Sequence, residues 1–202
     1  MCIEDVIRLL SVKKFPVFSF EELSAFYPAQ KPETLKKSLF RWKKRGWIKA
    51  LRKGLYELTF PVDLKIPDLY LANRIYAPSY ISLETALSQY ALIPEVAMAV
   101  VSVTCRTTRR FQNHHGLFLY RTIQPKAFCG YYIENHGGYD VFMAEPEKAL
   151  VDYVHFQTLR GGKFDPDEHR LDRKRVRKLK RNKMKFYAGL YGMDPGAASF
   201  LF

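Results

Sequence analysis

The sequence predicts an α+β fold, and three features of its apolar pattern indicate it. Apolar residues recur every three to four positions through much of residues 1–46, which is typical of short amphipathic helices. Val-rich and alternating segments between residues 97 and 143 indicate strands, and helical spacing returns after Pro146. With 202 residues, 48% of them apolar, the chain is long enough to bury a core, and disorder throughout is excluded.

Two short helices are expected at the start of the chain. The first carries one apolar stripe, formed by Ile3, Val6, Ile7 and Leu10. The second opens at Ser19, because Ser19 and Glu22 have the spacing of a capping box, in which each side chain satisfies a backbone N–H. Phe18 and Leu23 occupy the two positions of a hydrophobic staple, in which one apolar residue before the helix packs against another in its first turn. The helix ends by Pro28.

A third helix and a hairpin complete the first sixty residues. Pro32 suits the first position of a helix, since its missing N–H would have no partner there. The expected buried face consists of Leu35, Leu39 and Trp42, and Gly46 ends the helix in a left-handed conformation. Two short strands, residues 47–51 and 55–58, flank a turn at residues 52–54 that contains glycine.

Three short helices followed by a basic hairpin predict a winged helix-turn-helix over residues 1–60. The third helix of such a module can enter the major groove of DNA, and the hairpin lies along the backbone or minor groove. Arg41 is best suited to read a base, because its guanidinium fork matches guanine. The expected DNA-binding residues are Thr34, Lys36, Lys37, Arg41 and Lys44 on the helix, and Lys49, Arg52 and Lys53 on the hairpin. The alternative is a winged helix that contacts another protein.

Positive charge is concentrated in two blocks. The chain carries a formal charge of +13, of which residues 31–53 supply +9 and residues 160–185 supply +8, so the remainder is acidic at −4. Such blocks favour a polyanionic partner, here double-stranded DNA. Five other arginines suggest a second anion-binding surface: Arg106, Arg109, Arg110, Arg173 and Arg177. For Arg106, Arg109 and Arg110 the alternative is a solvated turn rich in threonine.

The rest of the chain is expected to form a linker, an α+β domain and a basic tail. Residues 61–66 form the linker, residues 67–160 the domain, and residues 161–202 a basic helix, from about 167 to 187, with a Gly-rich end. Within the domain we expect helices at 68–76, 82–90 and 147–159, and strands at 97–105, 117–123, 127–133 and 139–143. The strands are expected to form a small, mostly antiparallel sheet backed by the helices. Gly137 and Gly138 mark a hairpin between the last two strands.

Cysteine usage and hydropathy indicate a protein of the cytoplasm. The three cysteines, Cys2, Cys105 and Cys129, are odd in number and have no CxxC spacing, which argues against a disulfide framework or a structural zinc site. We expect Cys105 and Cys129 to be buried in strands. No run of 18 apolar residues and no secretory signal is present in the sequence, so we expect no membrane partner.

No residue pattern points clearly to an enzyme. P-loop, GxSxG and HExxH motifs are absent from the sequence, and we expect no catalytic residues, cofactor or metal site. His114 and His115 fall in a turn, where we expect two adjacent rings to point apart. We expect Asp165, Asp167 and His169 to lie at the acidic start of the last helix. The less favoured alternative is that they form the site of a metal-dependent nucleic-acid enzyme.

Several segments resemble one family, the AbiEi-like antitoxins of type IV toxin–antitoxin and abortive phage-infection systems. The segments are residues 43–48 with 53–56, residues 77–87, residues 102–104 with 107–111, and residues 144–152. The resemblance covers roughly residues 1–155. It implies a transcriptional regulator that represses its own promoter and counteracts a nucleotidyltransferase-like toxin. The second domain would then serve toxin antagonism, homodimer formation or both.

Overall fold

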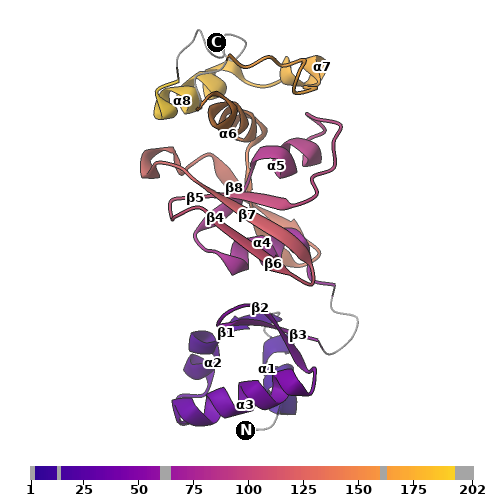
Figure 1. The fold of residues 1–202 in the computed structure, drawn as a ribbon, viewed down its shortest axis with the longest axis vertical. Helices are drawn as coiled ribbons and strands as arrows, with labels where there is room; N and C mark the ends of the chain where they lie inside the picture. Colours follow the sequence, from indigo (N-terminus) through magenta and orange to yellow (C-terminus); the bar gives the residue numbers. More distant parts are fainter. Residues whose placement is uncertain (1–2, 13–14, 60–64, 160–162, 194–202) are drawn as a thin grey trace.

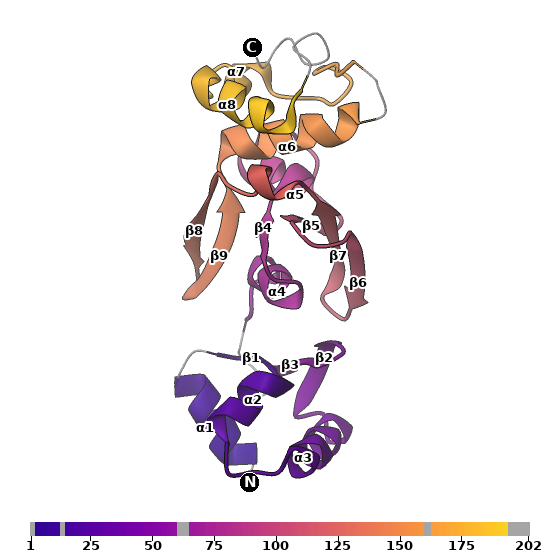
Figure 2. The ribbon, with the colours of Figure 1, turned by 90° about the vertical axis from the view of Figure 1, so that its left-hand side faces the viewer.

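The computed structural model describes residues 3–12, 15–59, 65–159 and 163–193. Within these ranges the chain forms eight α-helices, one short 3₁₀ helix and nine strands in two sheets, so the expected α+β class is confirmed. The molecule is elongated, with an N-terminal unit at one end, a six-stranded sheet in the middle and α6, α7 and α8 at the other end (Figures 1 and 2). No helix in the described ranges has the length and hydropathy to cross a membrane.

The N-terminal unit contains three helices and a small antiparallel sheet of strand order β1-β3-β2. Its elements are α1 (Ile3–Val12), β1 (Val17–Ser19), α2 (Phe20–Phe26), α3 (Pro32–Lys44), β2 (Ile48–Arg52) and β3 (Leu55–Leu58). The three expected helices and the hairpin are therefore present. Strand β1 was not expected; it is only three residues long and pairs with β3, far away in sequence.

Local signals place the ends of α2 and α3. The Ser19 hydroxyl accepts from the Glu22 N–H at 3.1 Å, and the Glu22 carboxylate accepts from the Ser19 N–H at 2.6 Å, so the capping box is formed. Pro32 occupies the first turn of α3. Gly46 adopts φ +73° just after the helix, a left-handed conformation that disfavours any side chain.

Both faces of the small sheet are buried. Phe18, Ile48 and Leu58 face the helices of the N-terminal unit. Val17, Leu51 and Leu55 face the other way and join the core of the second unit. Because alternate residues of a strand point to opposite faces, apolar residues on both faces predict a covered sheet. The sheet is thus packed between α1–α3 and the rest of the molecule.

The second unit is built on a mixed six-stranded sheet of order β6-β7-β5-β4-β9-β8. Three of its five strand pairings are antiparallel, and the pairings β4–β9 and β5–β7 are parallel. Its strands are β4 (Ser79–Ile81), β5 (Val100–Thr104), β6 (Arg109–Asn113), β7 (Gly116–Thr122), β8 (Tyr131–His136) and β9 (Tyr139–Ala144). Its helices are α4 (Asp68–Ile75), α5 (Leu83–Gln89), α6 (Pro146–Thr158) and the 3₁₀ turn η1 (Pro125–Ala127).

Several expectations for the second unit need correction. Strands β4 and β6 were not expected, because one is very short and the other is rich in polar residues. Cys105 and Cys129 lie outside the strands and are partly exposed. The expected linker at 61–66 and the tail after residue 187 fall largely outside the described residues.

The expected single basic helix at 167–187 is wrong. The segment forms two helices, α7 (Arg173–Val176) and α8 (Arg181–Tyr191). The Asp172 carboxylate starts α7 by accepting from the N–H groups of Lys174 and Arg175, and these bonds, chiefly that from Arg175, lower the pKa of Asp172. The Lys180 N–H donates to the Glu147 carboxylate on α6 at 3.0 Å, which starts α8 in a new direction.

A buried polar cluster joins α6 to β4 and α8. Lys148 and Asp152, one turn apart on α6, form an ion pair with no exposed side-chain surface. Asp152 also accepts from the hydroxyls of Tyr80 at 3.0 Å and Ser82 at 2.8 Å. The Lys148 ammonium donates to the Tyr191 hydroxyl at 2.9 Å, so the C-terminal helix is fixed to the centre of the second unit.

His155 makes the stability of this layer depend on pH. Its ring stacks on Tyr191 with centroids 4.0 Å apart, and burial lowers the pKa of His155 below its ordinary value. The folded protein therefore binds fewer protons at His155 than the unfolded chain does. The contribution of His155 to the free energy of unfolding is complete above about pH 6.5 and is lost as the pH falls below that value. We expect the urea midpoint to fall between pH 7 and pH 5, and to fall less in His155→Phe, which keeps the stacking. An equal fall in both proteins would remove His155 as a source.

Candidate nucleic-acid interface

One face of α3 presents cations and one aromatic ring at the end of the molecule away from α7 and α8 (Figure 1). Leu35, Leu39 and Trp42 are each at most 4% exposed and anchor the opposite face to the N-terminal core. Their burial fixes how α3 is rotated. The outward face forms a shallow depression lined by Thr34, Lys36, Lys37, Phe40 and Arg41.

The cations of this face have no acidic partner within the described part of the chain. Lys37, Arg41 and Lys44 are exposed and form no ion pair there. The Arg41 guanidinium donates to the Ser38 hydroxyl at 3.3 Å, a contact within the helix that leaves most of its donors facing outward. Lys36 lies over the Phe20 ring at 5.7 Å. The charge that the sequence places here is therefore presented to solvent.

Phe40 belongs to this face and was missed in the sequence. It is 70% exposed, which is unusual for a large aromatic side chain. Helical spacing places it beside Lys36, Lys37 and Lys44, and that spacing alone could have separated it from the buried positions. An apolar ring among cations can contact the methyl group of thymine while the cations contact phosphate.

The hairpin is less available than expected. Lys49 and Lys53 are exposed, but Arg52 donates from Nε to the Ile75 carbonyl at 2.5 Å and from Nη1 to the Lys53 carbonyl at 2.9 Å. The Leu51 carbonyl accepts from Asn113 at 3.3 Å. This end of the hairpin is thus docked on the second unit, because its outer face is apolar. Arg52, which we expected among the DNA-binding residues of the hairpin, is therefore held at the second unit.

The arginines of the expected second anion surface fall into two groups. Arg109 and Arg110 are exposed at the start of β6, while Arg106 donates to the Ala77 carbonyl at 2.9 Å and lies 4.5 Å over the Tyr76 ring. Arg173 is bonded to Asp167, whereas Arg177 is exposed on the C-terminal layer and has no acidic partner in the described ranges.

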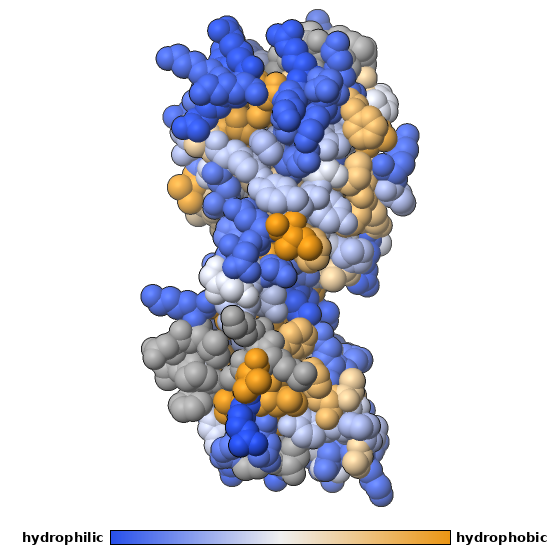
Figure 3. Space-filling model, turned by 180° about the vertical axis from the view of Figure 1, so that it is seen from behind, coloured by the Kyte–Doolittle hydropathy of each residue, from blue (hydrophilic) through white to orange (hydrophobic). Residues whose placement is uncertain are grey.

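The two basic blocks lie at opposite ends of the molecule. Figures 1 and 2 place α3 at one end and α7 and α8 at the other. Hydrophilic side chains crowd the end formed by α7 and α8 (Figure 3). The +9 and +8 blocks of the sequence therefore form separate surfaces, not one continuous patch.

The alternative enzyme site is not assembled as a metal site. The Asp167 carboxylate forms an ion pair with Arg173, and the Asp165 carboxylate accepts a hydrogen bond from the Asp167 N–H at 2.9 Å. His169 stacks on Phe164 with centroids 4.3 Å apart, and its Nδ1 lies 2.9 Å from the Tyr153 hydroxyl, whose pKa burial raises to about 12. The expected start of a helix at these residues is also wrong, since they form turns before α7.

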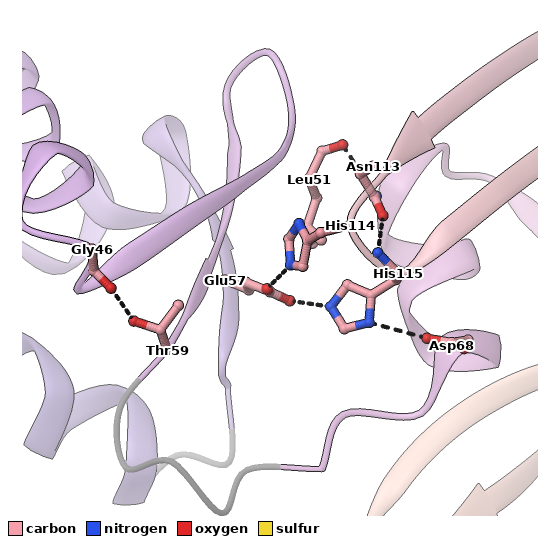
Figure 4. Close-up of polar contacts among 8 residues, drawn as sticks. All are labelled: Gly46, Leu51, Glu57, Thr59, Asp68, Asn113, His114 and His115. Carbon is pink, nitrogen blue, oxygen red and sulfur yellow. Dashed lines mark hydrogen bonds and ion pairs between the residues drawn. The ribbon is translucent and has the colours of Figure 1, made fainter.

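The two adjacent histidines do not point apart. His114 and His115 form the turn between β6 and β7, and both Nε2 atoms face the carboxylate of Glu57 on β3 (Figure 4). The alternation of side chains holds along a strand but not through a turn, where the chain reverses direction. Glu57 gave no signal in the sequence, because the contact joins residues nearly sixty positions apart.

No protein-family model matches the chain, and no curated protein matches it.

Proposed function

We propose that this protein is a DNA-binding transcriptional regulator of antitoxin type, in which residues 1–60 act as a winged helix-turn-helix. The single observation that carries the proposal is the outward face of α3, where several cations stand exposed without an acidic partner in the described chain. The order of three helices and a hairpin supports it. A helix anchored by one buried face and cationic on the other is suited to enter a major groove.

Within this proposal the residues of α3 have different roles. Arg41 reads a guanine, because its fork can donate to N7 and O6 together. Phe40 contacts a thymine methyl beside it. Lys36, Lys37 and Lys44 contact phosphates, which sets position and affinity but not sequence. Lys49 and Lys53 add backbone contacts, and Arg52 stays with the second unit.

Polar contacts between the two units support a fixed orientation of α3. Arg74 on α4 bonds both carboxylate oxygens of Glu22 at 2.7 and 2.8 Å, and also the Val17 carbonyl at 3.2 Å. A homodimer formed through the second unit would present two copies of α3 to half-sites that lie one helical turn, roughly 34–36 Å, or a multiple of it apart. We therefore expect an operator with inverted repeats.

The antitoxin part of the proposal rests on the resemblance of residues 77–87, 102–111 and 144–152 to AbiEi-like proteins. The partner would be a nucleotidyltransferase-like toxin encoded next to this gene. Co-expression tests it: this chain should restore growth to cells that produce the neighbouring toxin, and a neighbour of another kind would contradict it.

Binding to the DNA upstream of the gene tests the main proposal. We expect fluorescence anisotropy to report binding of the upstream fragment at least tenfold tighter than a scrambled fragment of equal length. With about five phosphate contacts, the logarithm of affinity should fall with the logarithm of salt at a slope of roughly −4 to −5. Equal binding of both fragments would contradict sequence-specific regulation, and binding of neither fragment would favour a winged helix that contacts protein.

A further inference from the structure

Glu57, His114 and His115 converge between the two units. Glu57 is on β3 of the N-terminal unit, and both histidines are in the β6–β7 turn of the second (Figure 4). His115 Nε2 lies 2.7 Å from one Glu57 oxygen, and His114 Nε2 contacts the other. One ligand atom from each of the three residues can be chosen so that all lie within 4.8 Å of one another.

The cluster combines a buried carboxylate with an accessible side. The Glu57 side chain is 6% exposed, while His114 and His115 are 34% and 23% exposed. A buried carboxylate needs a positive or donating partner. The accessible histidines leave a path for an ion and space for a water ligand.

A second layer of contacts orients His115. Its Nδ1 lies 3.2 Å from the Asp68 carboxylate at the start of α4. A carboxylate behind a histidine that binds metal fixes the ring and makes its other nitrogen a better ligand. Asn113 holds the turn, since its side chain accepts from the His115 N–H at 2.8 Å and donates to the Leu51 carbonyl at 3.3 Å.

We propose that Glu57, His114 and His115 bind a divalent transition metal, with Zn²⁺ the best match, and that the ion ties the N-terminal unit to the second unit. Two imidazoles and one carboxylate, with water as fourth ligand, form a known tetrahedral zinc set. Tetrahedral zinc separates its ligand atoms by about 3.3 Å, so the Glu57–His115 pair must open by about 0.6 Å and the closer Glu57–His114 pair by more. The inference is independent of DNA binding.

Zinc titration of tag-free protein, stripped with a chelator and then freed of it, tests the site. Competition with a chromophoric chelator should give one zinc per chain, and Co²⁺ should give the strong visible absorption of a tetrahedral ion. Glu57→Gln keeps the shape of the side chain but removes its charge and replaces one acceptor oxygen with a donor NH2 group, and should weaken zinc binding at least about 100-fold. Asp68→Asn should weaken it about 10- to 100-fold, because it removes only the orienting contact.

His136→Ala is the matched control, since His136 lies on β8 beside Glu134, away from the cluster. It should bind zinc as the wild type does. Circular dichroism without metal checks that each variant is folded. Failure of the wild type to bind one zinc, or equal affinity in Glu57→Gln and His136→Ala, would overturn the proposal and leave a hydrogen-bonded histidine pair.

Discussion

Arg41→Ala is expected to weaken binding of the upstream operator by about 1–3 kcal/mol, roughly 5- to 150-fold, and to relax the preference for guanine at one position. Arg41 is exposed on α3, and within the described residues its one side-chain hydrogen bond, to Ser38, lies inside that helix. The loss therefore falls on DNA contacts and not on the fold. Affinity for operators changed at each base pair in turn measures it.

Lys37→Ala is the companion variant, and its effect should differ in kind. Lys37 is exposed beside Arg41 and is expected to contact phosphate. Its loss should weaken all DNA sequences about equally and reduce the salt slope by about 1. The exposed Lys126, on the 3₁₀ turn, provides a control: Lys126→Ala should leave binding unchanged. A uniform loss in Arg41→Ala, with no change of base preference, would contradict its assigned role.

Lys148→Met is expected to lower the free energy of unfolding by about 3–5 kcal/mol. The substitution keeps the length of the side chain but leaves Asp152 as a buried carboxylate without a cation. The hydroxyls of Tyr80, Ser82 and Tyr191 still donate to it, but they carry no charge. The substitution also removes the ammonium that donates to Tyr191, which leaves the Tyr191 hydroxyl, within the described residues, only its bond to Asp152, so α8 should loosen first.

Urea unfolding of Lys148→Met and of the exposed control Lys126→Met measures this effect. The control should change stability by less than about 0.5 kcal/mol. In Lys148→Met, proteolysis should cut first near α8, and a double variant with Asp152→Asn should recover part of the loss because the lone charge is gone. A loss below about 1 kcal/mol would contradict the role given to the buried pair.

The helices and hairpin of the N-terminal unit were predictable, because local signals set them. The capping pair Ser19–Glu22, Pro32 at the start of α3 and Gly46 after it act within a few residues of each element. The buried face of α3 followed from helical spacing in the same way. The exposed face of α3 could therefore be assigned in advance, apart from Phe40.

Features that depend on distant contacts could not be predicted. Strand β1 exists because it pairs with β3, and β6 because it pairs with β7. Arg52 was assigned to a wing, yet Leu51 and Leu55 on the outer face of the sheet dock the hairpin on the second unit. The chain is extended at Lys180 between α7 and α8, where its N–H donates to Glu147 on α6, a distant contact that sequence spacing does not reveal.

Two of the segments on which the family expectation was based, residues 77–87 and 144–152, meet in the core. Tyr80 and Ser82 belong to one motif, Lys148 and Asp152 to another, and all four meet in the buried cluster. Their pattern is explained by the packing of α6 against β4. The residues of these motifs are therefore accounted for by the packing of this core, and the functional proposal depends on the surface of α3.

Charge reversal on α3, compared with an equal reversal elsewhere, tests the central claim most directly. Lys37→Glu/Arg41→Glu and Lys65→Glu/Lys126→Glu each change the net charge by the same amount, and all four residues are exposed. Measured on the upstream operator at one salt concentration, the α3 variant should lose at least about 100-fold in affinity, while the control variant stays within a few-fold of wild type. Equal losses in the two variants, or operator binding retained by the α3 variant, would contradict recognition of DNA by this face.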